Sequence, residues 1–325
     1  VLFGMIIPIV AIVIFASFFL MQNVIKTTDP TLDWLSLLIS TVGFGSVLYG
    51  FSSVGDKGWT DAIVWGTILI GVILITILIW RQNRLEHPFL NFKVFKTPEF
   101  ALATLLSSVV MIAMVGVELV LPLYLQIVHG MSAFHSGLTL LFGAIMMGVM
   151  SPITGNLFDR YGARRLAMTG MFILTIGTLP FAFLTRETPI FDVVFLYAVR
   201  MFGISMVMMP VTTSGMNALP FSMISHGTAV NNTIRQVASS MGSAILISVL
   251  TNVTNSQKPV HSLLKASPLQ YKSQMIDATL NGYHAAFWIA IAFAVIGLLA
   301  TSRLGNGNKI HAKYDSNAKK GGNAQ

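Results

Sequence analysis

The chain has 325 residues, of which 54% are hydrophobic and only 10% are charged, and its mean hydropathy is +0.74. Soluble domains carry about 25% charged residues, so this composition excludes a soluble globular protein and indicates an integral membrane protein. The net charge of +8 is expected from lysines and arginines in the cytoplasmic loops of a membrane protein, so it does not indicate a nucleic-acid-binding protein.

Nine apolar runs are predicted to cross the membrane as α-helices. Runs of about 20 residues match the length of a helix across the hydrocarbon layer, and these runs lack the alternation of a β-barrel strand. The sequence therefore predicts an all-α, polytopic membrane fold. In chain order the predicted spans are 2–21, 33–55, 60–81, 100–125, 132–157, 164–185, 190–217, 227–251 and 281–302.

The distribution of basic residues predicts the orientation of the chain. When the spans alternate in direction, most lysines and arginines fall in the segments after the first, third, fifth and ninth spans. Such segments are cytoplasmic by the positive-inside rule. This predicts a cytoplasmic C-terminus and makes segment 253–280 a long loop on the outer side. Because the chain begins at Val1 inside an apolar run, we expect it to be the later part of a longer protein.

Two changes in composition divide the chain. The segment from Arg81 to Phe100 is polar and contains Pro88 and Pro98 between two apolar spans, so a domain boundary is predicted there. The C-terminal tail is rich in Gly, Asn and Lys and is predicted to be disordered. The predicted divisions are 1–98, 99–303 and 304–325.

The fourth and seventh spans each contain a charged residue far from the span ends. At 1.5 Å per residue, Glu118 lies roughly 10 Å from the outer end of its span and Arg200 roughly 15 Å from the outer end of its own. Charges at such depth are costly in lipid and should face the bundle interior or a watery cavity. For Glu118 the interpretations stay open: proton coupling or cation binding in transport, or a structural role, either in an ion pair or as a glutamate at a wet cavity mouth. For Arg200 a cavity-facing or helix-fixing role is favoured over direct proton transfer.

A short charged turn joins the fifth and sixth spans. Its sequence is Gly155-Asn-Leu-Phe-Asp-Arg-Tyr-Gly-Ala-Arg-Arg165. Gly155 lets a neighbouring helix approach, and Gly162 can form a tight turn of two to four residues. Asp159 can accept hydrogen bonds from the next helix or pair with an arginine, while arginines suit an anionic membrane surface. The spacing favours a functional motif over an ordinary basic loop. Its candidate residues are Gly155, Asp159, Arg160, Gly162, Arg164 and Arg165.

The eighth span has a polar strip. Arg235 follows Asn231 by four positions and Gln236 follows Asn232 by four, so each pair shares a helix face. That strip should face protein or a cavity rather than lipid. Hydrogen bonding between helices is the favoured interpretation for the two asparagines. For Arg235 and Gln236, proton coupling or cavity lining stays open beside it.

Together these features resemble the major facilitator superfamily. In that family a loop like the Gly155–Arg165 turn joins the second and third helices of each six-helix half and helps to close the cytoplasmic gate. Phe142 departs from the family pattern, because a proline is expected after Leu141. Further segments resemble the fourteen-helix drug:proton antiporters of the EmrB/QacA type, namely Glu86–Lys96, Leu121–Gln126 and His226–Gln236.

The resemblance implies a fold and a function. Residues 1–98 would hold the last helix of an N-terminal half, two extra central helices and a cytoplasmic linker, and residues 99–303 the C-terminal six-helix half. The implied function is proton-coupled export of hydrophobic or cationic drugs across the cytoplasmic membrane of a bacterium, with multidrug resistance as its outcome. The implied partners are these substrates, protons and the lipid bilayer. The charged turn would be the gate motif, and the candidate coupling or cavity residues are Glu118, Arg200, Arg235 and Gln236.

Two alternatives to multidrug export stay open. One is a specific exporter of a single metabolite or lipid on the same fold. The other is a truncated remnant that sits in the membrane without transporting.

Signals for an enzyme are weak. The chain has no cysteine, and its histidines lack the spacing of a metal-binding helix. No phosphate-binding loop with a Walker lysine is present, so ATP is not expected as the direct energy source. The sequence predicts no catalytic residue, no metal and no cofactor.

Overall fold

The computed structural model describes residues 8, 10–17, 33–85, 88 and 90–305. The chain divides into two compact units, Val1–Asp33 and Trp34–Gln325. In the first unit, residues 8 and 10–17 are helical. Across all the described ranges the regular structure is helical and contains no strand, which confirms the predicted all-α fold. Most of predicted span 2–21 and nearly all of the predicted tail lie outside the described residues.

Eight helices in the described part of the chain are long and apolar enough to cross a membrane, and they match the second to ninth predicted spans. The elements are α2 (Trp34–Lys57), α3 (Ala62–Gln82), η1 (Phe92–Lys96), α4 (Pro98–Ile127), α5 (Ala133–Tyr161), α6 (Ala163–Thr178), η2 (Leu179–Phe183), α7 (Ile190–Asn217), η3 (Phe221–Met223), α8 (Ile224–Ser256), α9 (His261–Ala266) and α10 (Pro268–Thr301).

The predicted long loop 253–280 is wrong. Helix α8 continues to Ser256, the short α9 follows, and α10 already begins at Pro268. Polar residues end an apolar run without ending a helix, because Gln, Lys, Met and Leu are all good helix formers. Pro268 occupies the first turn of α10, where its missing N–H costs no hydrogen bond. These helices therefore extend well past the apolar stretch that the hydropathy marked.

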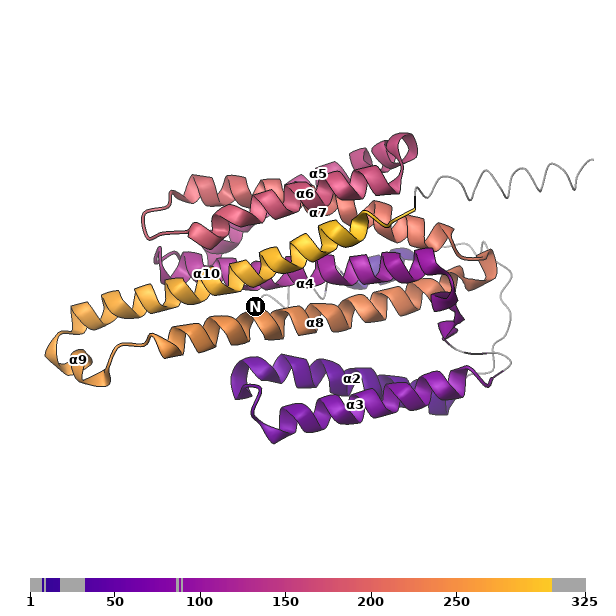
Figure 1. The fold of residues 1–325 in the computed structure, drawn as a ribbon, viewed down its shortest axis with the longest axis horizontal. Coiled ribbons are helices and arrows are strands. Elements are labelled where there is room, and N and C mark those ends of the chain that lie inside the picture. Colours follow the sequence, from indigo (N-terminus) through magenta and orange to yellow (C-terminus); the bar gives the residue numbers. More distant parts are fainter. Residues whose placement is uncertain (1–7, 9, 18–32, 86–87, 89, 306–325) are drawn as a thin grey trace, which may run out of the picture. The chain divides into compact units, whose positions relative to one another are not determined.

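Helix α4 packs against α7, α8 and α10 (Figure 1). It contributes many side chains to the main core. Packing between membrane helices depends on close contact, which small residues allow. The contact of α6 with α7 shows this at Gly170 and Gly203. A Cβ added to Gly203 would lie 2.7 Å from the backbone nitrogen of Leu174 and 2.9 Å from the carbonyl oxygen of Gly170. Two glycines thus set the spacing of this helix pair.

Helices α2 and α3 form a hairpin that packs on α8 (Figure 1). Asp61 begins α3 by accepting a hydrogen bond from the backbone N–H of Ile63 at 2.7 Å. At the other end of the hairpin, the buried Gln82 donates to Ser36 Oγ at 2.7 Å and accepts from the N–H of Leu90 at 3.1 Å. The polar segment after α3 is therefore anchored to the hairpin by a side chain that the sequence did not single out.

The two ends of the bundle are named after a residue at each. The Gly162 end holds the α5–α6 turn, the α3–α4 linker and the last residue of α10. The Arg186 end holds the α6–α7 loop, the α4–α5 loop and α9. Helices α2 to α8 and α10 run between these ends in alternating directions.

Candidate functional site

Arg200 and Glu118 lie near each other where α7 packs on α4. Arg200 is fully buried, and its Nη2 donates to the carbonyl oxygens of Ala113 at 2.5 Å and Met114 at 3.4 Å. Glu118 is half-buried one helical turn further along α4. The opposite charges of the two side chains attract each other. The structure thus brings together two residues that the sequence placed at similar depth, and the guanidinium is held by backbone carbonyls.

Arg200 retains donors beyond those it uses on α4. Its Nε and Nη1 are buried and have no hydrogen-bond partner among the residues that the structure describes. A buried donor without a partner costs free energy, and more so when it belongs to a charged group. Arg200 is therefore poised to donate to a further acceptor, and the carboxylate of Glu118 is a nearby group that attracts it.

Tyr197 is the third member of this cluster, and it was not predicted from the sequence. It lies on α7 three residues before Arg200, so the two side chains share a helix face. It is buried, and its hydroxyl interacts electrostatically with both Glu118 and Arg200. Helix α5 presses on it at Gly143, where an added Cβ would lie 2.3 Å from Tyr197 Cε1. Three helices therefore meet at the cluster, and the i, i+3 spacing to Arg200 was the available signal.

Helix α4 is locally weakened beside the cluster. Pro122 lies inside α4, and proline has no N–H to donate to the carbonyl four residues earlier. That carbonyl belongs to Glu118. Pro152 and Pro210 lie inside α5 and α7, so all three helices of the cluster contain a proline. The backbone at Glu118 can consequently shift at a lower cost than an unbroken helix.

Arg235 and Gln236 lie elsewhere on the bundle. Arg235 is half-buried, its Nη2 donates to Met111 Sδ at 3.7 Å, and its Nε has no partner among the described residues. Met111 precedes Glu118 by seven residues, which is about 10 Å along α4. Gln236 is exposed, whereas Asn231 is buried. Arg235 therefore meets α4 at a different level from the Glu118–Arg200 cluster.

The charged turn lies at the Gly162 end, far from that cluster. Helix α5 ends at Tyr161 and α6 begins at Ala163, so Gly162 alone makes the turn and the predicted two to four residues are too many. Its φ of +78° is a conformation that glycine adopts without strain. About 24 Å of helix α5 separates Gly143, beside Tyr197, from Asp159, at 1.5 Å per residue.

The other residues of the motif surround that turn. A Cβ on Gly155 would lie 3.2 Å from Met209 Cε on α7, so this glycine does admit a neighbouring helix. Arg160 stacks on the ring of Tyr161 at 5.5 Å. The charged side chains of the motif are exposed, namely Asp159, Arg160, Arg164 and Arg165.

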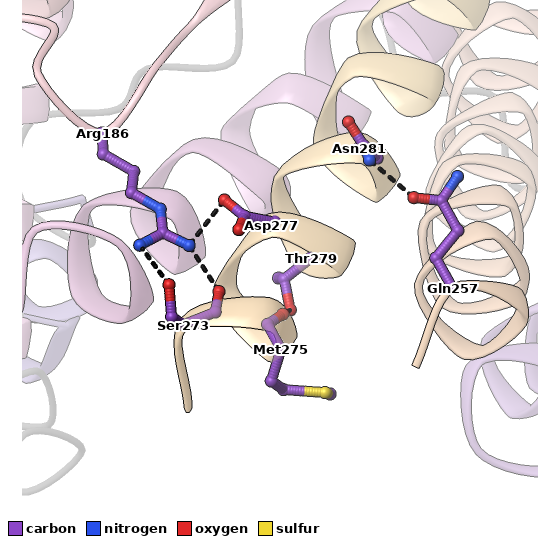
Figure 2. A network of polar contacts seen from close by, with 7 residues as sticks. All are labelled: Arg186, Gln257, Ser273, Met275, Asp277, Thr279 and Asn281. Atoms are coloured by element: carbon purple, nitrogen blue, oxygen red, sulfur yellow. Dashed lines mark hydrogen bonds and ion pairs between the residues drawn. The ribbon is translucent and has the colours of Figure 1, made fainter. Parts of the chain in front are cut away.

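Polar contacts that were not predicted from the sequence join the helices at the Arg186 end (Figure 2). Arg186 pairs with Asp277 at 2.5 Å and donates to both the hydroxyl and the carbonyl of Ser273 on α10. Asn281 Nδ2 donates to Gln257 Oε1 at 2.6 Å, which links α10 to the end of α8. Gln257, Ser273 and Asp277 belong to the segment that was predicted to be a loop, so their helical spacing was hidden.

His129 takes part in further polar contacts at the Arg186 end, beside α4. The hydroxyl of Tyr124 donates to the carbonyl of Thr185 at 2.7 Å, and His129 hydrogen-bonds to that hydroxyl at 3.0 Å. Burial lowers the pKa of His129 below its usual value, which favours the neutral imidazole. The α6–α7 loop is thereby held by both α4 and α10.

Comparison with known proteins identifies the family. The family model of the Major Facilitator Superfamily matches residues 53–243, which is more than half of the chain. The chain belongs to the major facilitator superfamily. It is a multi-pass membrane protein of a transporter family, and no catalytic family is indicated.

Proteins similar to this chain are found in bacteria. The chain is 44% identical to the MFS-type transporter YcnB of Bacillus subtilis, over 93% of the chain and 61% of YcnB. It is 37% identical to the lincomycin resistance protein LmrB of Listeria innocua, over 92% of the chain and 62% of LmrB. The chain thus spans about three fifths of the length of these relatives.

A solved structure shares the fold. It is an inward-facing, occupied bacterial homologue of the human lysosomal transporter Spinster, with a TM-score of 0.54 and 15% sequence identity. The match covers 82% of this chain and 64% of that one. At this identity the likeness concerns the fold alone, which is the major facilitator fold.

Proposed function

We propose that the protein exports hydrophobic or cationic drugs across the bacterial cytoplasmic membrane in exchange for protons, as part of a fourteen-helix antiporter of the EmrB/QacA type. Support comes from the family of the chain and from its similarity to LmrB, a lincomycin resistance protein. The positive-inside distribution of lysines and arginines supports a cytoplasmic C-terminus.

The observation that carries the coupling proposal is the half-buried Glu118 beside the fully buried Arg200. An ionised Glu118 attracts Arg200, whose Nε and Nη1 can donate to it. A protonated Glu118 loses that attraction, and Arg200 keeps its bonds to the carbonyls of Ala113 and Met114. A cationic substrate and a proton would therefore compete for the same carboxylate, as exchange requires.

The two states of Glu118 would bias a conformational equilibrium. A ligand shifts such an equilibrium only by its differential affinity for the two states. Pro122 removes the helical hydrogen bond to the carbonyl of Glu118, so α4 is able to respond locally. We propose that the two halves of the transporter rock about a central cavity and that the turn at Asp159 and Gly162 stabilises the state closed at the Gly162 end. Arg235 and Gln236 of α8 would line this central cavity at the level of Met111 rather than at the level of Glu118.

The test is pH-driven efflux of a cationic dye from vesicles that contain the protein expressed from its complete coding region. Glu118→Gln keeps the shape of the side chain and removes its charge, so we expect the dependence of efflux on the pH gradient to be lost. The matched control is Glu99→Gln, which changes an exposed glutamate in the first turn of the same helix and should transport normally. Unchanged efflux and unchanged pH dependence in Glu118→Gln would remove Glu118 from coupling.

Breadth of substrate is tested separately. A panel of chemically unrelated drugs should compete with the dye if the protein is a multidrug exporter. Competition by a single compound class would support the specific exporter instead. Absence of efflux for every compound would support a remnant that does not transport.

A further inference from the structure

A cavity at the Gly162 end combines apolar walls with two lysines. It has a volume of about 460 Å³ and lies where the α2–α3 hairpin, η1 and α8 meet. Its walls include Phe44 of α2, Ile79 of α3, Phe92 of η1 and Ile234 of α8, while Lys93 and Lys96 also line it. We call it the lysine cavity. A second apolar cavity of about 380 Å³ between α4 and α8 shares Phe95 and Ile234 with it, so the two adjoin.

The geometry of η1 places both lysines on one side. Residues three apart eclipse one another in a 3₁₀ helix, and Lys93 and Lys96 are three apart in η1. The element is fixed at its start by Asn91, whose Oδ1 accepts from the N–H of Lys93 at 3.1 Å. It is fixed in the middle by Val94, which is fully buried. The two ammonium groups are therefore presented together from a firmly anchored segment.

The charged side chains among the described residues that line the lysine cavity are all positive. Both lysines are exposed, and the described residues that line the cavity include no carboxylate. Glu99, an acidic neighbour in the sequence, lies in the first turn of α4 and does not line the cavity. A cationic compound would be repelled by this mouth, whereas an anionic group would be attracted to it.

An aromatic residue marks the level of the lipid headgroups near this cavity. Trp80 on α3 is exposed, and the guanidinium of Arg84 stacks on its ring at 4.1 Å. Exposed tryptophans and basic residues at the ends of membrane helices lie at the boundary between acyl chains and headgroups. Arg84 lies two residues past the end of α3, next to Asn83, which lines the cavity together with Ile79 of α3. The lysines thus lie at headgroup level and the apolar walls at acyl level.

We propose that the lysine cavity binds an anionic phospholipid, with its phosphate on Lys93 and Lys96 and an acyl chain along the apolar walls. Basic pockets between membrane helices bind anionic headgroups in this way. A small soluble anion would make no apolar contact with walls made of Phe44, Ile79 and Phe92. A lipid without net charge would leave the positive charge of the lysines uncompensated. The bound lipid would fill the contact between the α2–α3 hairpin and α8.

The site is independent of drug export. It lies at the Gly162 end, and neither lysine belongs to the Glu118–Arg200 cluster or to the charged turn. Its effect would be on stability, because a ligand that binds the folded state alone raises the free energy of unfolding.

The test measures thermal unfolding of the purified protein in neutral detergent, with phosphatidylglycerol, with phosphatidylcholine or without lipid, together with native mass spectrometry of the bound lipid. We expect phosphatidylglycerol to raise the unfolding temperature more than phosphatidylcholine does. The double variant Lys93→Gln, Lys96→Gln should bind phosphatidylglycerol roughly 30-fold more weakly, the factor expected when two lysines near an anionic headgroup are lost. The matched control, Lys258→Gln with Lys265→Gln, neutralises two lysines at the Arg186 end and should keep the preference.

A second variant tests the apolar part. Ile234→Trp enlarges a side chain that lines both cavities and leaves the lysines in place, so the preference for phosphatidylglycerol should fall. If this variant does not fold, the double variant Lys93→Gln, Lys96→Gln still tests the proposal, because exposed lysines contribute little to folding stability. Equal binding of phosphatidylglycerol by the wild type and the lysine variant would overturn the proposal. So would equal effects of the two lipids on the wild type.

Discussion

The Glu118–Arg200 cluster and the charged turn at Gly162 differ in how far their charged side chains are buried. Arg200 is fully buried and bonded to α4, whereas Arg164 and Arg165 are exposed at the end of a hairpin. A buried charge must be compensated inside the bundle, but an exposed one costs little and contributes little to stability. A change of charge in the cluster can therefore alter the free energy of unfolding of this chain by itself. The turn has to act on a further part of the transporter to have an equal effect.

The largest expected effect concerns the compensation of Arg200 by Glu118. Arg200→Gln leaves the half-buried Glu118 without its counter-charge and should lower the free energy of unfolding by about 3 kcal/mol. Adding Glu118→Gln removes the uncompensated carboxylate, so the double variant should be more stable than Arg200→Gln alone. Thermal unfolding in detergent of both single variants and the double variant measures the coupling. Strictly additive effects would show that the two charges do not interact.

A smaller effect is expected from crowding the cluster. Gly143→Ala would place a Cβ 2.3 Å from Tyr197 Cε1, which requires α5 or Tyr197 to move at a cost of about 1–3 kcal/mol. Gly148→Ala is the matched control, because a Cβ there meets nothing within 4 Å. Unfolding temperature and efflux should fall in the first variant and not in the second. Equal behaviour of the two alanine variants would separate Tyr197 from the site.

The smallest effect on stability is expected at the turn. Asp159 is exposed, so Asp159→Asn should leave the unfolding temperature and the amount of protein unchanged while slowing efflux severalfold through a weaker closed state. Asp192→Asn, at an exposed aspartate in the first turn of α7 at the Arg186 end, should leave efflux intact. Normal efflux in Asp159→Asn would reject the gate, and a large loss of stability would contradict the contrast between the two regions.

The sequence predicted the membrane helices well, because an apolar run about 20 residues long has few alternatives in lipid. It failed where helices leave the apolar layer. The apolar run ends near residue 251, but the residues that follow it still have a high helical propensity. For this reason α9 and the first turns of α10 were predicted as a loop. The polar contacts of Arg186 with Ser273 and Asp277 were hidden by that error.

The candidate site was predictable in part. A charge deep in a span is visible in any sequence, which is why Glu118 and Arg200 were found. The carbonyls that hold Arg200 cannot be read from side-chain patterns, and Tyr197 carries no charge to draw attention. The close approach of α5 at Gly143 depends on the rotation of two helices about their axes, which nearly uniform apolar faces do not reveal.

Proton release on substrate binding tests the central claim most directly. A saturating cationic substrate is added to the purified protein in a weakly buffered solution acidic enough to protonate Glu118, and the protons released are measured. The wild type and Glu99→Gln should release protons, because substrate displaces the proton from Glu118, and Glu118→Gln should bind substrate without releasing them. Equal proton release by Glu118→Gln and the wild type would contradict the assignment of Glu118 as the group that exchanges a proton for substrate.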